Sequence, residues 1–459
     1  MHREEKDSLG IKNVPMDAYY GVQTVRALEN FALSGLRSDP VLIASYGIIK
    51  KAAAMVNQEC GILSSEKAEV IIKAAEEIIN GSLNDQIPID VFQAGAGTSF
   101  NMNINEVIAN RALEMMGYPK GHYEAIHPND DVNMSQSTND TFPTALRISA
   151  LLYHKKLLKE LFTLYQALKT KAKEFSKVIK SGRTHLQDAL PITLGQEFAS
   201  YAVIIATQIQ HLQKAVKPLH YLGVGGTAVG TGINSPPHYS RKMVKKLSFL
   251  TNLTFKKAAN LIEKMQSMGD FTCYSAALRN LALELIKISN DLRLMSSGPR
   301  TGLAEIELPA VQPGSSIMPG KINPSICEAL TMVCFQVVGN DLTIATASLS
   351  GQLELNVMLP LIAFNLLFSQ KILTNGIAMF TQKCIKNIKA NTERCRFYFE
   401  NSVSLVTLLS PEIGYEKAAD LAKESKTTGK TVLILIEEKQ LLSPEEFKKL
   451  MNLKNLTGK

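Results

Sequence analysis

The chain of 459 residues contains no tryptophan, and its first ten residues, MHREEKDSLG, are charged and lack the apolar core of a signal peptide. No apolar run approaches the roughly 18–20 residues that a membrane-spanning helix needs. A cleaved leader and a membrane span are therefore both unexpected. The sequence predicts a cytoplasmic protein with no membrane partner.

Cysteine is sparse as well. None of the six cysteines forms a CxxC pair, and they lie scattered at Cys60, Cys273, Cys327, Cys334, Cys384 and Cys395. In a long chain this pattern favours reduced and mostly buried thiols over a disulfide framework or a zinc site. HExxH and GxSxG motifs are missing too, which argues against a metalloprotease site and a serine-hydrolase elbow. The sequence therefore predicts neither a metal site nor a cofactor.

Acidic residues are fewer than basic ones: the chain has 42 Asp and Glu residues and 50 Lys and Arg residues, which gives a net charge of +8. Much of the excess lies in lysine-rich segments such as KTKAKEFSK (169–177). No aromatic residues interleave with a basic stripe, so we expect no nucleic-acid partner. A basic balance suits a small dianionic substrate, provided that a local site can bind it.

Long amphipathic helices are the main feature of the middle of the chain. In 275–295 the apolar residues recur at spacings of 3, 4, 3, 4 and 3, and they are Leu278, Leu281, Leu285, Ile288, Leu292 and Met295. Residues 143–176 carry two apolar stripes, and 195–219 and 324–349 have the same character. Such helices pack side by side as a bundle, and other subunits could cover their second faces. We therefore predict an all-α fold with a long central helical bundle.

Breaks on either side of the bundle indicate smaller domains. Residues 1–140 are punctuated by Gly, Pro and Asn, and the helical pattern shortens again after about residue 395. We predict an N-terminal domain at 1–140, a helical-bundle domain at 141–394 and a small helical C-terminal domain at 395–459. Within the last, Ser443 before Pro444 has the pattern of a helix N-cap.

The glycine-rich run GVGGTAVGTG (223–232) does not predict a dinucleotide site. Its glycines do not give GxGxxG, and a helical pattern precedes them rather than a strand. A sharp loop between long helices is the better interpretation.

Four polar segments do not fit simple packing. They are QAGAGTSFNMN (93–103), HPNDDVNMSQSTND (127–140), SGRTHLQDA (181–189) and GSSIMPGKINP (314–324). Each alone has a structural interpretation, as a helix cap with its turn or as a structural histidine. Together they offer hydroxyls, amides, one histidine and one lysine without a metal-ligand cluster. That inventory suits binding of a small carboxylate-rich molecule and proton chemistry without a cofactor.

GSSIMPGKINP resembles the signature loop of the aspartase/fumarase superfamily, and the other three segments follow in that family's order. The resemblance extends from YYGVQTVRALENF (19–31) to GYEKAA (414–419). It implies a homotetramer whose central helices form one shared bundle, with each active site built from residues of three subunits. It implies no cofactor, and no ligand cluster supports activation by divalent cations.

Two activities compete within the family. GAGTS (95–99), Thr138 in QSTND and GQLELNV (351–357) resemble aspartases, whereas HPNDDVN and GKINPSICEAL would also suit a fumarase. Leu359 departs from the glutamate that aspartases commonly have there. We expect an ammonia-lyase that converts aspartate to fumarate and ammonium, with a class II fumarase that interconverts malate and fumarate as the alternative. A structural relative without activity is a third hypothesis, but it could have lost residues such as Ser315 that are present here.

The resemblance also implies roles for single residues. The β-carboxylate of the substrate would be held by Thr98, Ser137, Thr138 and Ser316. Lys321 and Asn323 would clamp the α-carboxylate through charge and amide donation. The amino group would face Thr184, Asn139 and His185.

Catalysis would centre on Ser315, Lys321 and His185. Removing a proton from carbon beside a carboxylate makes an enediolate dianion, which donors must stabilise as its charge develops. Ser315 would be the base, as an alkoxide that Lys321 helps to form, on a lid bracketed by glycines. His185 stands where fumarases have a catalytic histidine with an acidic partner matching Glu328. A histidine there is not universal in aspartases, so we expect it to bind rather than to be essential.

Overall fold

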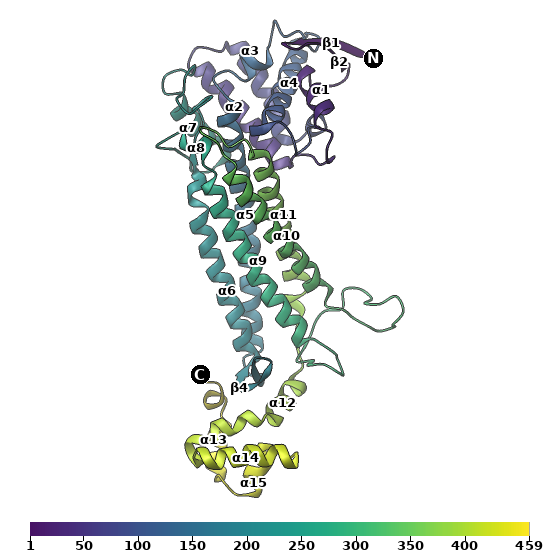
Figure 1. Ribbon diagram of the computed structural model, residues 1–459, viewed down its shortest axis with the longest axis vertical. Coiled ribbons are helices and arrows are strands. Elements are labelled where there is room, and N and C mark those ends of the chain that lie inside the picture. The colour runs from purple at the N-terminus through teal and green to yellow at the C-terminus, as the bar shows by residue number, and fades with distance from the viewer. Residues whose placement is uncertain (459) are drawn as a thin grey trace. The chain divides into compact units, whose positions relative to one another are not determined.

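The computed structural model describes residues 1–458 (Figure 1). The chain folds as two compact units, each assembled from three stretches. Unit 1 comprises Met1–Leu157, His211–Asn280 and Gln336–Leu373, and unit 2 comprises Leu158–Gln210, Leu281–Phe335 and 374–458. The predicted division at residues 140 and 394 stays a prediction.

Five long helices each contribute residues to both units. They are α5 (Thr138–Glu174), α6 (Leu194–Ala215), α9 (Gly269–Met295), α10 (Ser325–Leu349) and α11 (Leu359–Lys383). The predicted stripe on α9 is buried along its length, from Leu278 to Met295. On α5, one of the two predicted apolar stripes, formed by Leu157, Leu161, Leu164 and Leu168, is fully buried, whereas Phe162, a residue of the other stripe, is 46% exposed. Helices dominate and strands form only two-stranded ladders within residues 1–458, which confirms the all-α fold.

Unit 1 adds short helices and a hairpin to its parts of the long helices. Its other elements are β1 (His2–Asp7), β2 (Gly10–Pro15), α1 (Val22–Asn30), α2 (Pro40–Glu59), α3 (Ser65–Asn80), η1 (Asn84–Gln86), η2 (Gly95–Gly97), α4 (Thr98–Met115), η3 (Pro128–Val132), η4 (Lys217–His220), β5 (Tyr221–Leu222), α7 (Tyr239–Thr251), β6 (Lys256–Lys257) and α8 (Glu263–Gln266). Buried polar side chains link its long helices, since Gln370 of α11 donates to the Tyr274 hydroxyl of α9 at 3.0 Å. The Tyr274 hydroxyl also bonds His154 of α5.

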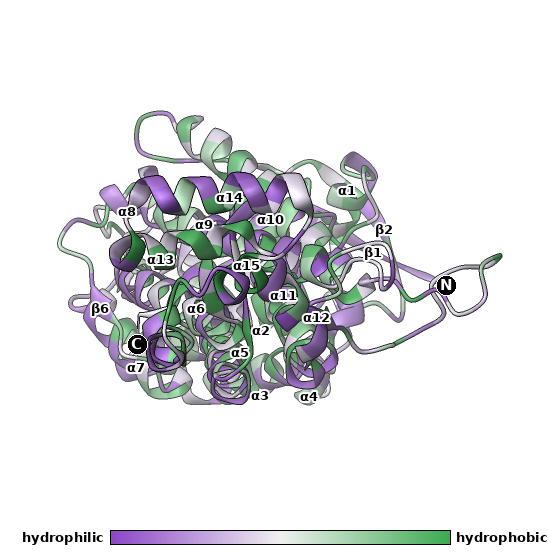
Figure 2. Ribbon diagram, turned by 90° about the horizontal axis from the view of Figure 1, so that it is seen from below, coloured by the Kyte–Doolittle hydropathy of each residue, from purple (hydrophilic) through white to green (hydrophobic). Residues whose placement is uncertain are grey.

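Unit 2 adds one hairpin and a small helical assembly. Its other elements are β3 (Ile179–Thr184), β4 (Gln187–Thr193), β7 (Ile306–Glu307), η5 (Ile385–Asn387), β8 (Lys389–Ala390), α12 (Thr392–Asn401), η6 (Val403–Leu405), α13 (Val406–Ile413), α14 (Tyr415–Thr428), α15 (Val432–Glu438), α16 (Pro444–Leu450) and α17 (Leu453–Thr457). Leu409 and Leu435 belong to the apolar cluster of the last helices, and hydrophilic residues are prominent along α14 (Figure 2). The predicted cap is confirmed, because Ser443 forms a capping box with Glu446.

Two helical stretches, α10 and Leu359–Asn387, are long and apolar enough to cross a membrane by length and composition alone. The prediction that no run approaches such a length is wrong by this measure, because it considered unbroken apolar runs. The core helix of a soluble protein passes the same test. Asn340 of α10 donates to Ser369 of α11 at 2.9 Å, a buried polar contact that suits two helices packed against each other. The cytoplasmic location stays a prediction.

The glycine-rich run at 223–232 forms a loop before α7, as predicted. The residues before it differ from the prediction in one respect. Tyr221–Leu222 is a two-residue strand, β5, which pairs in parallel with β6. A pair this short leaves no trace in the periodicity of the sequence. The parallel crossover from β5 through α7 to β6 is only two residues wide and the run lacks GxGxxG, so it does not form a dinucleotide site of the Rossmann kind.

The starts of α4 and α5 lie against each other in unit 1, and a glycine makes this possible. Gly97 precedes α4 with φ +87°, and a Cβ on it would lie 2.1 Å from the ring of Phe142 in the first turns of α5. Any side chain at this position would push the two helices apart. Gly97 therefore sets the spacing between two helix N-termini.

Substitution of the two glycines that flank α4 separates crowding from backbone strain. Gly117, just after α4, also has positive φ (+81°), but nothing lies within 4 Å of a Cβ built there. We expect Gly117→Ala to lower the free energy of unfolding by about 1–2 kcal/mol, the cost of a left-handed L-residue. Gly97→Ala should cost clearly more, because the Phe142 ring must move as well. Urea denaturation of both variants measures the difference, and equal losses would contradict the crowding at Gly97.

Candidate functional site

Thr98 and Thr138 are each the first residue of a long helix in unit 1. Thr98 begins α4 and Thr138 begins α5, and the contact between Gly97 and Phe142 holds the two starts together. The first N–H groups of a helix have no partner within the helix, and the helix dipole makes this end positive. At these two starts the Phe100 N–H already donates to Gln93 Oε1 and the Asn139 N–H to Ser137 Oγ, so an anionic group such as a carboxylate would be attracted by the helix dipoles and the remaining N–H groups.

Ser137 and Asn139 are already engaged in the local structure at the start of α5. The Ser137 hydroxyl oxygen accepts a hydrogen bond from the Asn139 backbone N–H at 3.2 Å. Its own proton can still be donated to a ligand, because a hydroxyl both donates and accepts. The Asn139 side-chain amide donates to the carbonyl of Ala228 at 2.8 Å, which leaves it one further N–H.

Asp140 is a buried anchor that the sequence reading passed over. One carboxylate oxygen accepts the N–H groups of Gly225 and Thr227 at 2.8 and 3.0 Å, and the other accepts the N–H of Ser137. Burial raises the pKa of Asp140 to about 7, and these three backbone donors oppose that rise. Asp140 thus ties the glycine-rich loop to the start of α5. Its sequence signal was its position as the last residue of QSTND.

Lys50 places a buried amine behind the same helix start. Its Nζ donates to Asn133 Oδ1 at 2.9 Å and to Gln136 Oε1 at 3.0 Å, and Gln136 directly precedes Ser137. Burial lowers the pKa of Lys50 to about 7. No carboxylate in residues 1–458 lies within ion-pair distance of Lys50 Nζ, so its hydrogen bonds are accepted by amide oxygens alone. A lysine within the apolar run YGIIKKAAAMV of α2 was the available signal.

Two segments that carry the resemblance meet in unit 1. The Ala96 N–H donates to the carbonyl of Val357 at 2.8 Å, so GAGTS (95–99) lies against the end of GQLELNV (351–357). Leu359, the departure noted in the sequence, follows at the start of α11 and is fully buried. Its side chain is part of the packing and is not available to a ligand.

In unit 2, Thr184 and His185 lie at the tip of the β3–β4 hairpin. Thr184 pairs with Gln187, and the two residues between them, His185 and Leu186, have φ of 53° and 61°. Positive φ at both central residues is the mark of a type I′ turn. Thr184 and His185 are both exposed, so their polar atoms are open to a ligand.

Residues 308–324 form the loop before α10, and hydrogen bonds close it on itself. The Gly314 N–H donates to the Lys321 carbonyl at 2.8 Å, and the Asn323 side chain donates to the Gly314 carbonyl at 2.6 Å. A Cβ on Gly314 would lie 2.5 Å from the Lys321 carbonyl oxygen, so glycine is required there. One amide N–H of Asn323 is thus used by the loop itself.

Ser315 Oγ accepts hydrogen bonds from the backbone N–H groups of Ile317 and Met318 at 3.2 and 3.0 Å. Two N–H donors stabilise negative charge on the oxygen, as an alkoxide requires. Ser315 also lines a hollow of about 450 Å³ together with Lys321. Ser316 and Lys321 are exposed on the same loop.

The predicted site residues thus form three groups. Unit 1 brings together Thr98 with Ser137, Thr138 and Asn139; in unit 2 the hairpin tip holds Thr184 and His185, and the loop holds Ser315, Ser316, Lys321 and Asn323. In the described residues no hydrogen bond or ion pair joins the hairpin tip to the loop. The individual roles of these residues remain predictions.

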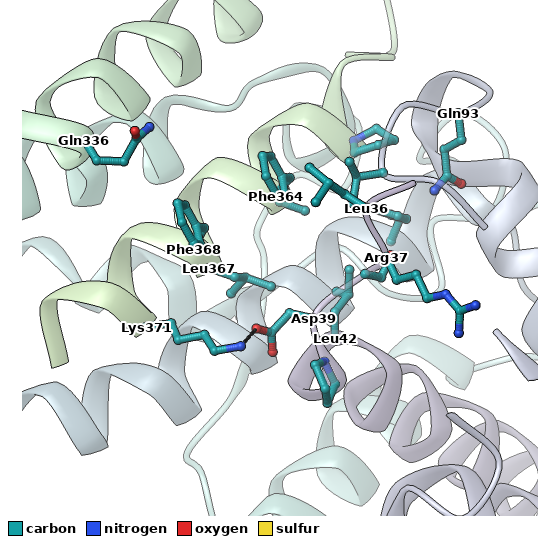
Figure 3. Close-up of a pocket in the computed structure, with 16 residues that line it drawn as sticks. Leu36, Arg37, Asp39, Leu42, Gln93, Gln336, Phe364, Leu367, Phe368 and Lys371 are labelled. Atoms are coloured by element: carbon teal, nitrogen blue, oxygen red, sulfur yellow. Dashed lines mark hydrogen bonds and ion pairs between the residues drawn. The ribbon is translucent and has the colours of Figure 1, made fainter. Parts of the chain in front are cut away.

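An apolar cavity of about 460 Å³ in unit 1 is a separate feature (Figure 3). Phe364, Leu367 and Phe368 of α11 line it, and at its edge Lys371 lies 3.5 Å from the carboxylate of Asp39. Because this lysine is already opposite a carboxylate and the walls are mostly apolar, the cavity does not suit a dicarboxylate.

Comparison with known proteins covers nearly the whole chain. A family model described as "Lyase" matches residues 10–339, and one described as "Fumarase C C-terminus" matches 405–458. An aspartate ammonia-lyase from a Bacillus species is 50% identical over 450 residues, which cover 98% of this chain and 96% of the relative. A class II fumarate hydratase from Thermosynechococcus vestitus is 46% identical over 99% of this chain and 98% of its own length.

A solved structure has the same fold. It is described as fumarate lyase:delta crystallin from Brucella melitensis bound to cobalt, and it is 48% identical, with a TM-score of 0.95 over 99% of both chains. Full-length identity near one half and an almost superimposable fold go well beyond a shared signature loop. The resemblance found in GSSIMPGKINP is confirmed, and this chain belongs to the lyase family that is also called the aspartase/fumarase superfamily.

Proposed function

We propose that this lyase reversibly deaminates L-aspartate to fumarate and ammonium, with Ser315 as the base. The observation that carries the proposal is the environment of Ser315. Its oxygen receives two backbone N–H groups on a loop that also presents Lys321. The 50% identity to an aspartate ammonia-lyase over 98% of the chain supports aspartate as the substrate.

The reaction begins when the Ser315 alkoxide takes a proton from the carbon next to the β-carboxylate. The electron pair left behind moves into that carboxylate and gives an enediolate dianion. It then returns to form the carbon–carbon double bond, while the C–N bond breaks and its electron pair leaves with ammonia. Each donor aimed at the developing charge can lower the activation free energy by roughly 3–4 kcal/mol.

Neutral donors suit the β-carboxylate because they stabilise the dianion without binding the ground state equally strongly. Thr98, Ser137, Thr138 and Ser316 supply hydroxyls, and the helix starts of α4 and α5 supply N–H groups. Lys321 and Asn323 bind the α-carboxylate, whose charge does not change during the reaction. Thr184, Asn139 and His185 bind the amino group. The reaction requires no cofactor, since the proton and the leaving group are handled by side chains.

A homotetramer with shared active sites is part of the proposal. Along α10, four apolar side chains spaced three, seven and seven residues apart are 60–79% exposed, namely Met332, Phe335, Leu342 and Leu349. An exposed apolar stripe of this kind marks a surface for another protein chain. Copies that pair through α10 could bring polar segments of different chains into one active site.

A class II fumarase is the second candidate. A fumarate hydratase is 46% identical over 99% of the chain, and Leu359 departs from the aspartase pattern. The hairpin tip also presents His185, where fumarases have their catalytic histidine. The description of the Brucella melitensis protein includes delta crystallin, so a structural role without activity is the third hypothesis. The presence of Ser315, Lys321 and Thr184 argues against that role.

Formation of fumarate from two substrates decides between these functions. The purified chain is incubated with L-aspartate and, separately, with L-malate, and the ultraviolet absorbance of fumarate is followed. We expect fumarate from aspartate, with ammonium released in equal amount. Fumarate from malate alone would establish the fumarase, and no fumarate from either would favour the structural role.

Two substitutions in the loop should separate chemistry from binding. Ser315→Ala removes the base, so we expect turnover to fall by at least about 10²-fold while succinate, a non-reacting dicarboxylate, still binds. Lys321→Met removes the charge that holds the α-carboxylate, so succinate should bind more weakly. Calorimetry and steady-state kinetics measure the two effects. Near-normal turnover of Ser315→Ala would exclude it as the base, and unchanged succinate affinity of Lys321→Met would remove Lys321 from the binding site.

Mixing two inactive chains tests whether active sites are shared. Thr138→Ala alters unit 1 and Ser315→Ala alters unit 2, and each alone should have low activity. If a site combines segments of different copies, co-expression of the two variants produces mixed tetramers in which some sites carry neither substitution. We expect activity to reappear in the mixed particles, which sedimentation can identify as tetramers. Mixed tetramers that stay as inactive as the parents would show that each site comes from a single chain.

A further inference from the structure

We infer that Glu305 is a positioning residue, which holds the Thr184–His185 hairpin tip in a fixed relation to the loop that carries Ser315. The inference rests on the proposed function for its meaning in catalysis. Its structural basis lies wholly within unit 2 and is independent of the substrate.

The Glu305 carboxylate is fully buried and binds two cations of the same strand. One oxygen lies 2.6 Å from Lys180 Nζ, and the other lies 2.6 Å from Arg183 Nη1. Both cations belong to β3, and Arg183 is the residue directly before Thr184. The position of the hairpin tip is therefore coupled to the Glu305 carboxylate through Arg183, the charged residue next to the tip.

The hairpin is irregular at the point where this binding occurs. Lys180 and Arg183 are three positions apart, and in a regular strand they would point to opposite faces. The register shifts between Ser181 and Arg183, so that Gly182 faces two residues of β4. The extra residue of this bulge lies in β4, where it bends and twists the hairpin locally, and the long side chains of both cations on β3 reach the same carboxylate. A Cβ on Gly182 would lie 2.6 Å from the carbonyl oxygen of Leu190, so the bulge also needs this glycine.

Arg183 is held on a second side by an aromatic ring. Its guanidinium lies 5.2 Å from the ring centroid of Tyr398 in α12. The Tyr398 hydroxyl in turn donates to the Gly302 carbonyl at 3.2 Å, three residues before Glu305. The Arg183 guanidinium thus contacts the Glu305 carboxylate and the Tyr398 ring, and the Tyr398 hydroxyl is hydrogen-bonded to the segment that carries Glu305.

The backbone of Glu305 is itself fixed. Its N–H donates to the Met295 carbonyl at 2.8 Å, and its carbonyl accepts the Asn391 N–H at 2.9 Å. The next two residues pair with Lys389–Ala390 as β7 and β8. Glu305 is therefore anchored at the foot of the 308–324 loop, just before the chain leaves regular structure. One rigid residue connects the two elements that supply catalytic groups in unit 2.

Two cations, Lys180 and Arg183, lie opposite two carboxylates, Glu305 and Glu197. The second carboxylate provides a matched control. Glu197 of α6 also contacts Lys180, at 3.0 Å, but it does not contact Arg183 and lies far along the chain from the loop. Removing Glu197 leaves Lys180 paired with Glu305 and leaves Arg183 undisturbed. Removing the charge of Glu305 instead leaves Arg183 without its carboxylate. Only the second change should release the hairpin tip.

The test compares Glu305→Gln with Glu197→Gln in the full-length protein. We expect Glu305→Gln to increase hydrogen exchange across residues 179–193 and to lower kcat by up to about 10²-fold, since misplacement of a catalytic group by 1 Å can have that effect. KM should change less than kcat. Glu197→Gln should keep both exchange and kcat near the wild-type values. A purely structural role would reduce the yield of folded protein but leave the kcat of the folded molecules intact.

A second pair of variants covers the case in which Glu305→Gln does not fold. Arg183→Met removes the ion pair with Glu305 and the cation–π contact with Tyr398 but leaves the Glu305–Lys180 pair, whereas Arg183→Lys keeps a charge opposite Glu305. We expect faster exchange at the tip in Arg183→Met and partial restoration in Arg183→Lys. Exchange at the tip that is unchanged in both folded Glu305→Gln and Arg183→Met would overturn the inference. The exchange measurement needs no substrate, so a failure of the proposed aspartase activity would leave it valid.

Discussion

The apolar faces of the long helices have to be buried, and this constraint fixes where the polar segments of the site can lie. Thr138 begins α5, the β3–β4 hairpin connects α5 with α6, and the Ser315 loop ends where α10 begins. Polar groups at these positions interrupt no apolar stripe. The helices provide rigid supports, and the segments at their ends provide the hydroxyls, amides and N–H groups that a binding site for an anion needs.

Buried ionisable groups form the second layer of this arrangement. Asp140 ties the glycine-rich loop to the start of α5, Lys50 lies behind that start, and Glu305 holds the hairpin. None of them needs to touch a substrate. Each is costly to bury, and each is compensated by N–H groups, amides or opposite charge. The neutral hydroxyls that would meet the dianion are therefore backed by buried ionisable groups that hold the backbone in place.

Much of the fold was predictable from the sequence because its signals are local. Leucine spacing identified α9, Ser443 and Pro444 identified a capped helix, and GSSIMPGKINP identified the family. The missed features depend on residues far apart in the chain. Glu305 is 122 positions from its partner Arg183, and Gly97 is crowded because Phe142, from another helix, packs against it. β5 was missed for the same reason, since its partner β6 lies beyond α7. Most predicted site residues are exposed or half-buried, with Thr138 as a buried exception, whereas the supporting residues Lys50, Asp140 and Glu305 are fully buried.

The bulge opposite Gly182 has a consequence for how this hairpin can change over evolution. Side chains alternate along a strand, so one residue added between the bulge and the turn would send the Thr184 hydroxyl to the other face of the ribbon. Two added residues would restore the direction of the Thr184 hydroxyl but would move it away from the contact between Arg183 and Glu305. Beyond Thr184 and His185, which the proposed function needs, the tip can vary in the identity of its residues but hardly at all in its length. Among descendants of this chain, substitutions should accumulate here long before any insertion or deletion survives.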